Sequence, residues 1–148
     1  EDLKEYYSSV LSAFELDDGH FLHKEDKSFF EKMMQIIDSH IQNTDLSVEL
    51  LSSSLGYSTR QFYRKLKNVT EKTPADIIRE YRLTIVERLL LTTQLSIEEI
   101  MDKTGFSNRG TFYKAFAQKF EMTPKQYRNI KTKDVHDVSE EGGGTMNA

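Results

Sequence analysis

The sequence of 148 residues predicts an all-α protein of about seven helices, in which two helix-turn-helix subdomains are joined by a long central helix. Three observations carry this prediction. Apolar residues recur at spacings of three and four, and no stretch alternates as a half-buried strand does. A segment of 28 aligned positions occurs twice, at offsets of 49 and then 50, with 11 identities. Each copy places a glycine between two helical stretches, which is typical of a tight turn.

The first segment, residues 1–26, is expected to be an acidic leader with a short amphipathic helix. It contains eight acidic and two basic residues. His20 and His23 lie near two aspartates, but their spacing matches no metal-binding motif, so we expect no metal site. The apolar residues at helical spacing are Leu3, Tyr7, Val10, Leu11 and Phe14, and the turn residues Asp17, Asp18 and Gly19 follow them.

The main domain is expected over residues 27–133, between this leader and a disordered acidic and glycine-rich tail over residues 134–148. The tail has three consecutive glycines and no apolar period, so it cannot offset the entropy lost on ordering. The domain opens with an amphipathic helix. The apolar face of this opening helix is predicted to consist of Phe30, Met33, Met34, Ile37 and Ile41.

The first motif is expected over about residues 46–72. Ser47 is a candidate N-cap of its first helix. Gly56 then tolerates the positive φ of a turn. Ser58 follows, with Gln61 at the spacing of a capping box, so the second helix should cover about residues 59–69.

A long linker helix is expected over about residues 74–91. It should start at Thr73-Pro74, because proline fits the first helical position, where its missing N–H is not needed. At 1.5 Å per residue its length is about 27 Å, comparable to the roughly 34 Å between successive major grooves of B-DNA. Its apolar face is predicted to be Ile78, Tyr81, Ile85 and Leu89.

The second motif is expected over about residues 95–121, with its second helix over about 109–120. Ser96 and Glu99 have the spacing of a capping box. Gly105 supplies the turn, and Ser107 marks the cap region of the second helix.

The outer faces of the two second helices differ in charge. In the first motif Phe62, Leu66 and Val69 form a core face, and the opposite face is cationic with one aromatic ring: Arg60, Tyr63, Arg64 and Lys67. Like charges on one face repel each other, so folding alone gives no reason for them, whereas duplex DNA does. In the second motif the core face is Phe112, Phe116 and Phe120, and the outer face has fewer cations: Gly110, Tyr113, Lys114 and Ala117. We therefore expect the first motif to supply more of the affinity.

The net charge of the whole chain, -4, argues against binding to nucleic acid, but the charge is distributed unevenly along the sequence. Residues 27–133 contain 18 basic and 12 acidic residues, so the acidity belongs to the two ends.

The absence of cysteine excludes disulfides, thiolate zinc sites and cysteine nucleophiles. No apolar segment approaches the roughly 20 residues of a membrane span, and no secretion signal opens the chain, so we expect a cytoplasmic protein. No catalytic constellation or cofactor motif is present, so we expect no enzyme activity and no cofactor.

The second motif resembles the signature of AraC/XylS-type transcriptional regulators. The residues that carry the resemblance run from Ile97 and Ile100 through Gly105-Phe106-Ser107, Phe112 and Phe116 to Phe120, Met122-Thr123-Pro124 and Tyr127-Arg128, and the resemblance covers about residues 29–131. It implies a homeodomain-like fold and base-reading positions at Arg60, Tyr63, Arg64, Arg109, Gly110, Thr111 and Lys114. With the flanking positions, the predicted DNA-binding set is Ser58, Thr59, Arg60, Tyr63, Arg64, Lys67, Asn108, Arg109, Gly110, Thr111, Tyr113 and Lys114.

Two functions stay open from the sequence. The first is a sequence-specific regulator of transcription that inserts both second helices into adjacent major grooves of double-stranded DNA. The alternative is a helical protein-interaction module or signalling output domain that does not bind DNA. The resemblance further implies RNA polymerase as a partner and an upstream sensing or receiver domain absent from this chain. The segment Phe62-Tyr63-Arg64-Lys65-Leu66-Lys67 also resembles the corresponding sequence in output domains of hybrid two-component sensors from gut Bacteroidetes.

Overall fold

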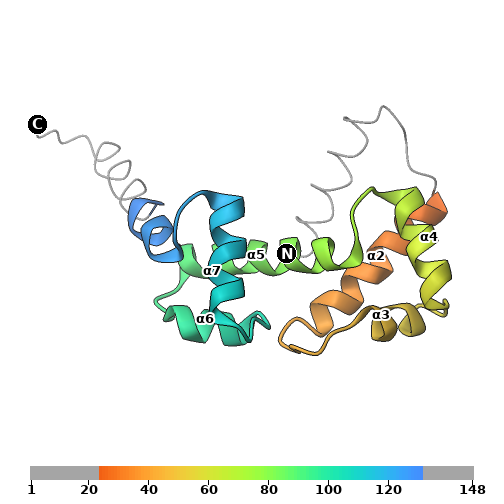
Figure 1. The fold of residues 1–148 in the computed structure, drawn as a ribbon, viewed down its shortest axis with the longest axis horizontal. Coiled ribbons are helices and arrows are strands. Elements are labelled where there is room, and N and C mark those ends of the chain that lie inside the picture. The colour runs from red at the N-terminus through yellow and green to blue at the C-terminus, as the bar shows by residue number, and fades with distance from the viewer. Residues whose placement is uncertain (1–23, 132–148) are drawn as a thin grey trace, which may run out of the picture. The chain divides into compact units, whose positions relative to one another are not determined.

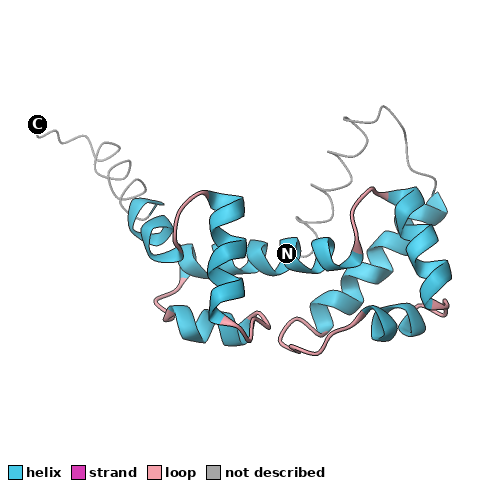
Figure 2. Ribbon diagram, viewed as in Figure 1, coloured by secondary structure: helices cyan, strands magenta, loops and turns pink. Residues whose placement is uncertain are grey.

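A computed structural model describes residues 24–131 of the chain. The leader helix expected within residues 1–23, His20 and His23, and the tail over residues 134–148 lie outside the described residues. Within them, every regular element is a helix and loops connect the helices (Figure 2), as the sequence predicts. No helix in this part of the chain combines the length and apolar character needed to cross a bilayer. The chain divides into two compact units, with the boundary between Ile85 and Val86.

Unit 1 contains α2 (Lys24–Ser39), α3 (Val48–Ser54), α4 (Thr59–Val69) and the first part of α5 (Pro74–Thr92), as labelled in Figure 1. Its helices pack because each presents one apolar face to a shared core. Ile41, expected on the face of the opening helix, lies in the turn after α2, partly buried against the same core. The fully buried side chains of this core include Phe30, Met33, Met34, Ile37, Leu51, Phe62, Ile77 and Tyr81.

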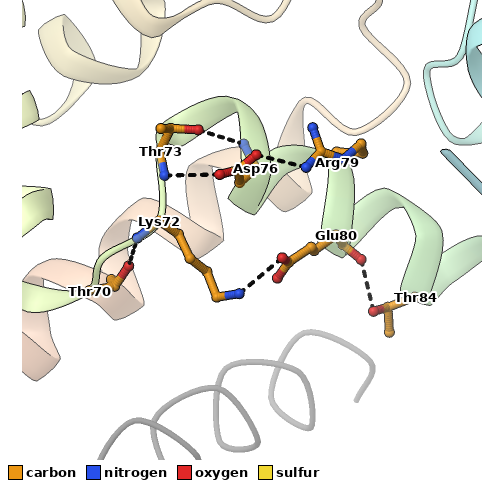
Figure 3. A network of polar contacts seen from close by, with 7 residues as sticks. All are labelled: Thr70, Lys72, Thr73, Asp76, Arg79, Glu80 and Thr84. Carbon is orange, nitrogen blue, oxygen red and sulfur yellow. Dashed lines mark hydrogen bonds and ion pairs between the residues drawn. The ribbon is translucent and has the colours of Figure 1, made fainter. Parts of the chain in front are cut away.

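The connection between α4 and α5 is fixed by polar contacts (Figure 3). The Thr73 hydroxyl accepts a hydrogen bond from the Asp76 backbone N–H at 3.1 Å, and the Asp76 carboxylate accepts one from the Thr73 N–H at 3.4 Å. This reciprocal cap satisfies donors that the first helical turn leaves unpaired. Pro74 is the first residue of α5, which confirms the predicted start. Lys72 adds an ion pair with Glu80 at 3.0 Å.

Unit 2 contains the end of α5, α6 (Ile97–Lys103), α7 (Arg109–Phe120) and a last helix over residues 124–131. An aromatic cluster forms much of its core. The Phe116 ring lies 4.4 Å from that of Phe120 and 5.7 Å from that of Tyr127, measured between ring centroids. Burial, with the hydrogen bond that the Tyr127 hydroxyl donates to Glu87, raises the pKa of Tyr127. The buried side chains of unit 2 include Leu90, Ile100, Met101, Phe112, Ala115, Phe116 and Tyr127.

The end of α5 is held by an arginine from the last helix. The Arg128 guanidinium donates hydrogen bonds to the carbonyl oxygens of Leu90 at 2.9 Å, Thr93 at 3.2 Å and Leu95 at 2.8 Å. The last carbonyls of a helix have no partner within the helix and carry partial negative charge. Arg128 therefore stabilises the end of α5 and ties it to the last helix of unit 2.

Candidate nucleic-acid interface

The start of α4 is set by a turn and a cap, as predicted. Gly56 has φ of 82°, in the left-handed region that favours glycine. The Ser58 hydroxyl accepts a hydrogen bond from the Gln61 backbone N–H at 3.1 Å, and the Gln61 side chain accepts one from the Ser58 N–H at 2.9 Å. This capping box fixes the first residue of α4 at Thr59. The side chain of Ser58 thus already has a structural role, and Thr59 beside it is half-buried.

The outer face of α4 is an exposed cationic surface. Phe62, Leu66 and Val69 are buried on the inner face, which confirms the predicted division of the helix. Opposite them lie Arg60, Tyr63, Arg64 and Lys67, all exposed, with 47% of the Tyr63 side chain accessible. We call these four residues the α4 outer face.

The cations of the α4 outer face have no partner among the described residues: neither an ion pair nor a hydrogen bond connects Arg60, Arg64 or Lys67 to any of them. The neighbouring Lys65 differs. Its ammonium group pairs with Asp26 at 2.8 Å and lies 5.8 Å from the centre of the Phe29 ring. The hydrogen bond with Asp26 is also the main cause that raises the pKa of Lys65. The fold therefore neutralises the cation that faces α2, whereas no residue of the described part of the chain neutralises the outward ones.

α7 begins at Arg109, as predicted, but its N-cap lies one residue after the Ser107 expected from the sequence. The N-cap is Asn108, whose side-chain oxygen accepts a hydrogen bond from the Thr111 N–H at 2.8 Å; Ser107 lies in the loop before it. Gly105, with φ of 78°, and Phe112 are seven residues apart, whereas Gly56 and Phe62 are six apart. The turn of the second motif is longer by one residue, and the cap moves with it.

This extra residue changes which side chains are equivalent. When the N-caps Ser58 and Asn108 are superposed in sequence, Arg60 matches Gly110, and Thr59 matches Arg109. The repeat at an offset of 49 paired Arg60 with Arg109, and this pairing is wrong within the helices. A Cβ atom added to Gly110 would lie 3.3 Å from the Asn108 side-chain oxygen, so a larger residue there crowds the cap.

The outer face of α7 is exposed but less cationic. Arg109, Gly110, Thr111 and Lys114 are exposed and Tyr113 is half-buried. Lys114 has no ion pair or hydrogen bond to any other described residue, whereas Arg109 does. Its guanidinium donates hydrogen bonds to the Glu98 carboxylate and, at 3.1 Å, to the Tyr113 hydroxyl. The hydrogen bond from Arg109 lowers the pKa of Glu98, so this carboxylate is ionised at neutral pH.

Local sequence patterns do not predict the partner of Arg109, nor do they predict that Arg82 and Arg128 have structural roles. Glu98 lies on the exposed side of α6, 11 residues before Arg109, and no local pattern connects the two. Arg82 and Arg128 add to the basic charge of residues 27–133 but donate to backbone carbonyls. Burial also lowers the pKa of Arg82. The one feature of the sequence that singles out Arg128 is its position next to Tyr127, at the end of the segment that resembles the AraC/XylS-type signature.

Comparisons with known proteins agree with this geometry. A family model described as a helix-turn-helix domain matches residues 51–130. Histidine kinase P4 of Formosa agariphila is 34% identical over 104 residues, which cover 70% of this chain and 8% of that kinase. Regulatory protein SoxS of Escherichia coli K12 is 30% identical over 103 residues, which cover 70% of this chain and 95% of SoxS. The chain thus spans a small part of the kinase and nearly all of SoxS.

Among solved structures, one is a transcriptional regulator from Chromobacterium violaceum, described as belonging to the AraC-type DNA-binding domain-containing proteins. It superposes with a TM-score of 0.65 at 25% sequence identity, covering 72% of this chain and 95% of that one.

Proposed function

The chain belongs to the AraC-type family of helix-turn-helix transcription regulators, and from that premise we propose that it reads duplex DNA with the outer faces of α4 and α7. In helix-turn-helix proteins the second helix of the motif enters the major groove. α4 and α7 are the second helices here, and each begins at a capped, exposed end after a glycine turn. The proposed DNA-binding domain is residues 27–133.

The observation that carries this proposal is the charge of the α4 outer face, whose cations have no partner in the described part of the chain. Three cations and a half-exposed tyrosine share the face opposite the buried Phe62. Arginine can donate two hydrogen bonds to guanine or to phosphate, lysine neutralises phosphate, and tyrosine contacts a thymine methyl or a backbone oxygen. A face with this composition, whose cations have no partner within residues 24–131, is suited to a polyanion.

The proposal extends to both motifs acting on one site. α5 has 19 residues, or about 28 Å at 1.5 Å per residue, which is comparable to the spacing of about 34 Å between successive major grooves on one side of B-DNA. We expect one asymmetric site whose two half-elements lie about 10 base pairs apart. A footprint confined to one half-element contradicts the use of both motifs.

In-vitro selection from a random duplex library, followed by a salt titration on the selected sequence, tests the proposal. Several phosphate contacts should give a log-log slope of about -0.9 per contact between 50 and 200 mM salt. Failure to enrich any sequence above bulk duplex, or binding that ignores salt, would instead favour a protein-interaction module.

Two matched substitutions rank the motifs. Arg64 and Lys114 are equivalent when the N-caps are superposed, and both are exposed and unpaired among the described residues. We expect Arg64→Ala to lower affinity for the selected site more than Lys114→Ala does, because α4 has more cations than α7. The reverse order would assign the larger share of affinity to the second motif.

The role of the whole protein is part of the proposal. Because the chain matches a segment of a histidine kinase, we propose that it is the output domain of a two-component regulator in which another domain receives the signal. RNA polymerase is the proposed partner on the promoter, and the cytoplasm the proposed compartment. Restoring the neighbouring domains and measuring transcription from the selected site with and without phosphorylation tests this assignment.

A further inference from the structure

Arg109 is held on two sides before any DNA is bound. One terminal nitrogen donates to the Glu98 carboxylate on α6, and the other donates to the Tyr113 hydroxyl at 3.1 Å. The guanidinium carbon also lies 5.1 Å from the centre of the Tyr113 ring. Arg60, Arg64, Lys67 and Lys114 have no such partner among the described residues, so Arg109 differs from every other cation predicted to contact DNA.

The first motif contains the same two residue types without the contact. Glu49 lies 11 residues before Arg60, as Glu98 lies before Arg109, but the described residues show no ion pair between Glu49 and Arg60. The reason is the longer turn of the second motif. Arg109 is the first residue of α7 and Arg60 the second residue of α4, and one residue corresponds to a rotation of about 100° around a helix. Arg60 therefore points in a different direction relative to the preceding helix.

The bound carboxylate leaves Arg109 able to contact a base. A guanidinium has five N–H donors, and the two contacts use one on each terminal nitrogen, so three donors stay available. Two of them suffice for the O6 and N7 atoms of guanine. Guanine presents neutral acceptors, so this contact places no second negative charge beside Glu98.

A contact between Arg109 and a phosphate group is less favourable than its contact with guanine. Its full negative charge would lie close to the Glu98 carboxylate, and two like charges near one guanidinium repel each other. Turning Arg109 away from Glu98 to reach a phosphate removes the ion pair instead. Either route costs free energy that a guanine contact does not cost.

We propose that Glu98 is a specificity-determining residue, which positions Arg109 toward a base edge and penalises its contact with phosphate. The inference rests on the proposed function, because it requires the outer face of α7 to meet duplex DNA. Glu98 itself acts through Arg109 and is a positioning residue.

The test compares Glu98→Gln with the matched control Glu49→Gln in the full chain. Glutamine keeps the size of the side chain and an acceptor oxygen but removes the charge. Each variant is titrated with the selected duplex and with a random-sequence duplex of equal length, at several salt concentrations. Both side chains are exposed, with 62% of the Glu98 side chain accessible, so neither change should alter the fold, which circular dichroism checks.

Both variants should bind the random duplex more tightly, because each removes one negative charge near the DNA. The ratio of affinities for selected over random duplex should fall about three-fold for Glu98→Gln, as expected for an exposed ion pair, and should not change for Glu49→Gln. In an Arg109→Ala background, Glu98→Gln should leave the ratio unchanged. An unchanged ratio in Glu98→Gln, an equal fall in Glu49→Gln, or an equal fall without Arg109 overturns the proposal.

Measurements on the wild-type chain distinguish a failure of the proposal for Glu98 from a failure of the proposed function. If the wild type prefers the selected duplex and Glu98→Gln retains the full ratio, the role of Glu98 is refuted and DNA binding stands. If the wild type enriches no sequence, both are refuted.

Discussion

Replacing Arg128 with methionine should destabilise unit 2 and leave unit 1 unaffected. Besides a longer hydrogen bond to the Leu89 carbonyl at 3.5 Å, Arg128 donates three hydrogen bonds of 2.8 to 3.2 Å to backbone carbonyls at and beyond the end of α5. Methionine has a similar length, but it has no hydrogen-bond donor. The substitution removes all of these bonds and the positive charge at the negative end of the helix dipole.

The magnitude follows from these contacts. A hydrogen bond that involves a charged group contributes about 1.5 to 3 kcal/mol, so three would sum to about 5 kcal/mol or more. Arg128 is half-buried, so water reaches part of the site and hydrates some of the released carbonyls. We therefore expect a loss of about 2 to 3 kcal/mol for Arg128→Met. Arg128→Lys should lose about half as much, because an ammonium group keeps the charge but cannot span the carbonyls as a planar guanidinium does.

Amide hydrogen exchange measured by NMR on the full chain assigns the loss to a unit. Exchange in α7 should accelerate roughly 30- to 150-fold in Arg128→Met, since about 1.4 kcal/mol corresponds to a factor of ten, and exchange in α4 should not change. The control is Lys125→Met, which removes an exposed cation from the same helix. The reasoning is refuted if the two variants differ by less than about 0.5 kcal/mol, or if α4 is affected as strongly as α7.

Three further predictions concern helix ends. Glu121 caps α7 with φ of 60°, so Glu121→Gly should raise the free energy of unfolding by about 1 kcal/mol in urea denaturation; a decrease would show that its backbone is unstrained. Ser96→Ala removes the cap of α6 and should cost about 1 kcal/mol in the same assay, and a loss below about 0.3 kcal/mol would contradict it. The hydrogen bond from Arg79, with those from Thr73, lowers the pKa of Asp76 below its ordinary 3.8. Its stabilising effect is therefore present above that pH and lost as the pH falls through the lowered pKa, so Asp76→Asn should flatten the acid limb of the stability profile.

Local patterns predicted the starts of most helices. Ser47, Ser58 and Ser96 cap the helices that follow them, Pro74 begins α5, and Gly56 occupies a turn with positive φ. These features depend on contacts within about four residues, so the residue types and their spacing suffice to identify them. The exception is the cap of α7. The turn before α7 has one residue more than the turn before α4, and the sequence alone does not show whether this extra residue lies before or after Ser107.

The sequence predicts which side of α4 is exposed, but it does not predict which cations of the candidate interface are paired with an acidic residue. The period of 3.6 residues identified the exposed side of α4, since the opposite side had to be apolar. It could not tell that Arg109 is paired with Glu98 while Arg64 has no partner among the described residues. The predicted roles of the twelve DNA-binding residues stay predictions until binding is measured.

The sequence by itself determined most of the helices and their caps, the two glycine turns and the side of α4 that faces away from the core. Tertiary structure decided what each cation does: Lys65 meets Asp26, Arg82 donates to the Asn43 carbonyl, and Arg128 holds the end of α5. The physical reason is the distance along the chain between partners. A cap or a turn is satisfied by its neighbours, whereas these cations find partners 33 to 39 residues away, which only packing brings within hydrogen-bond distance.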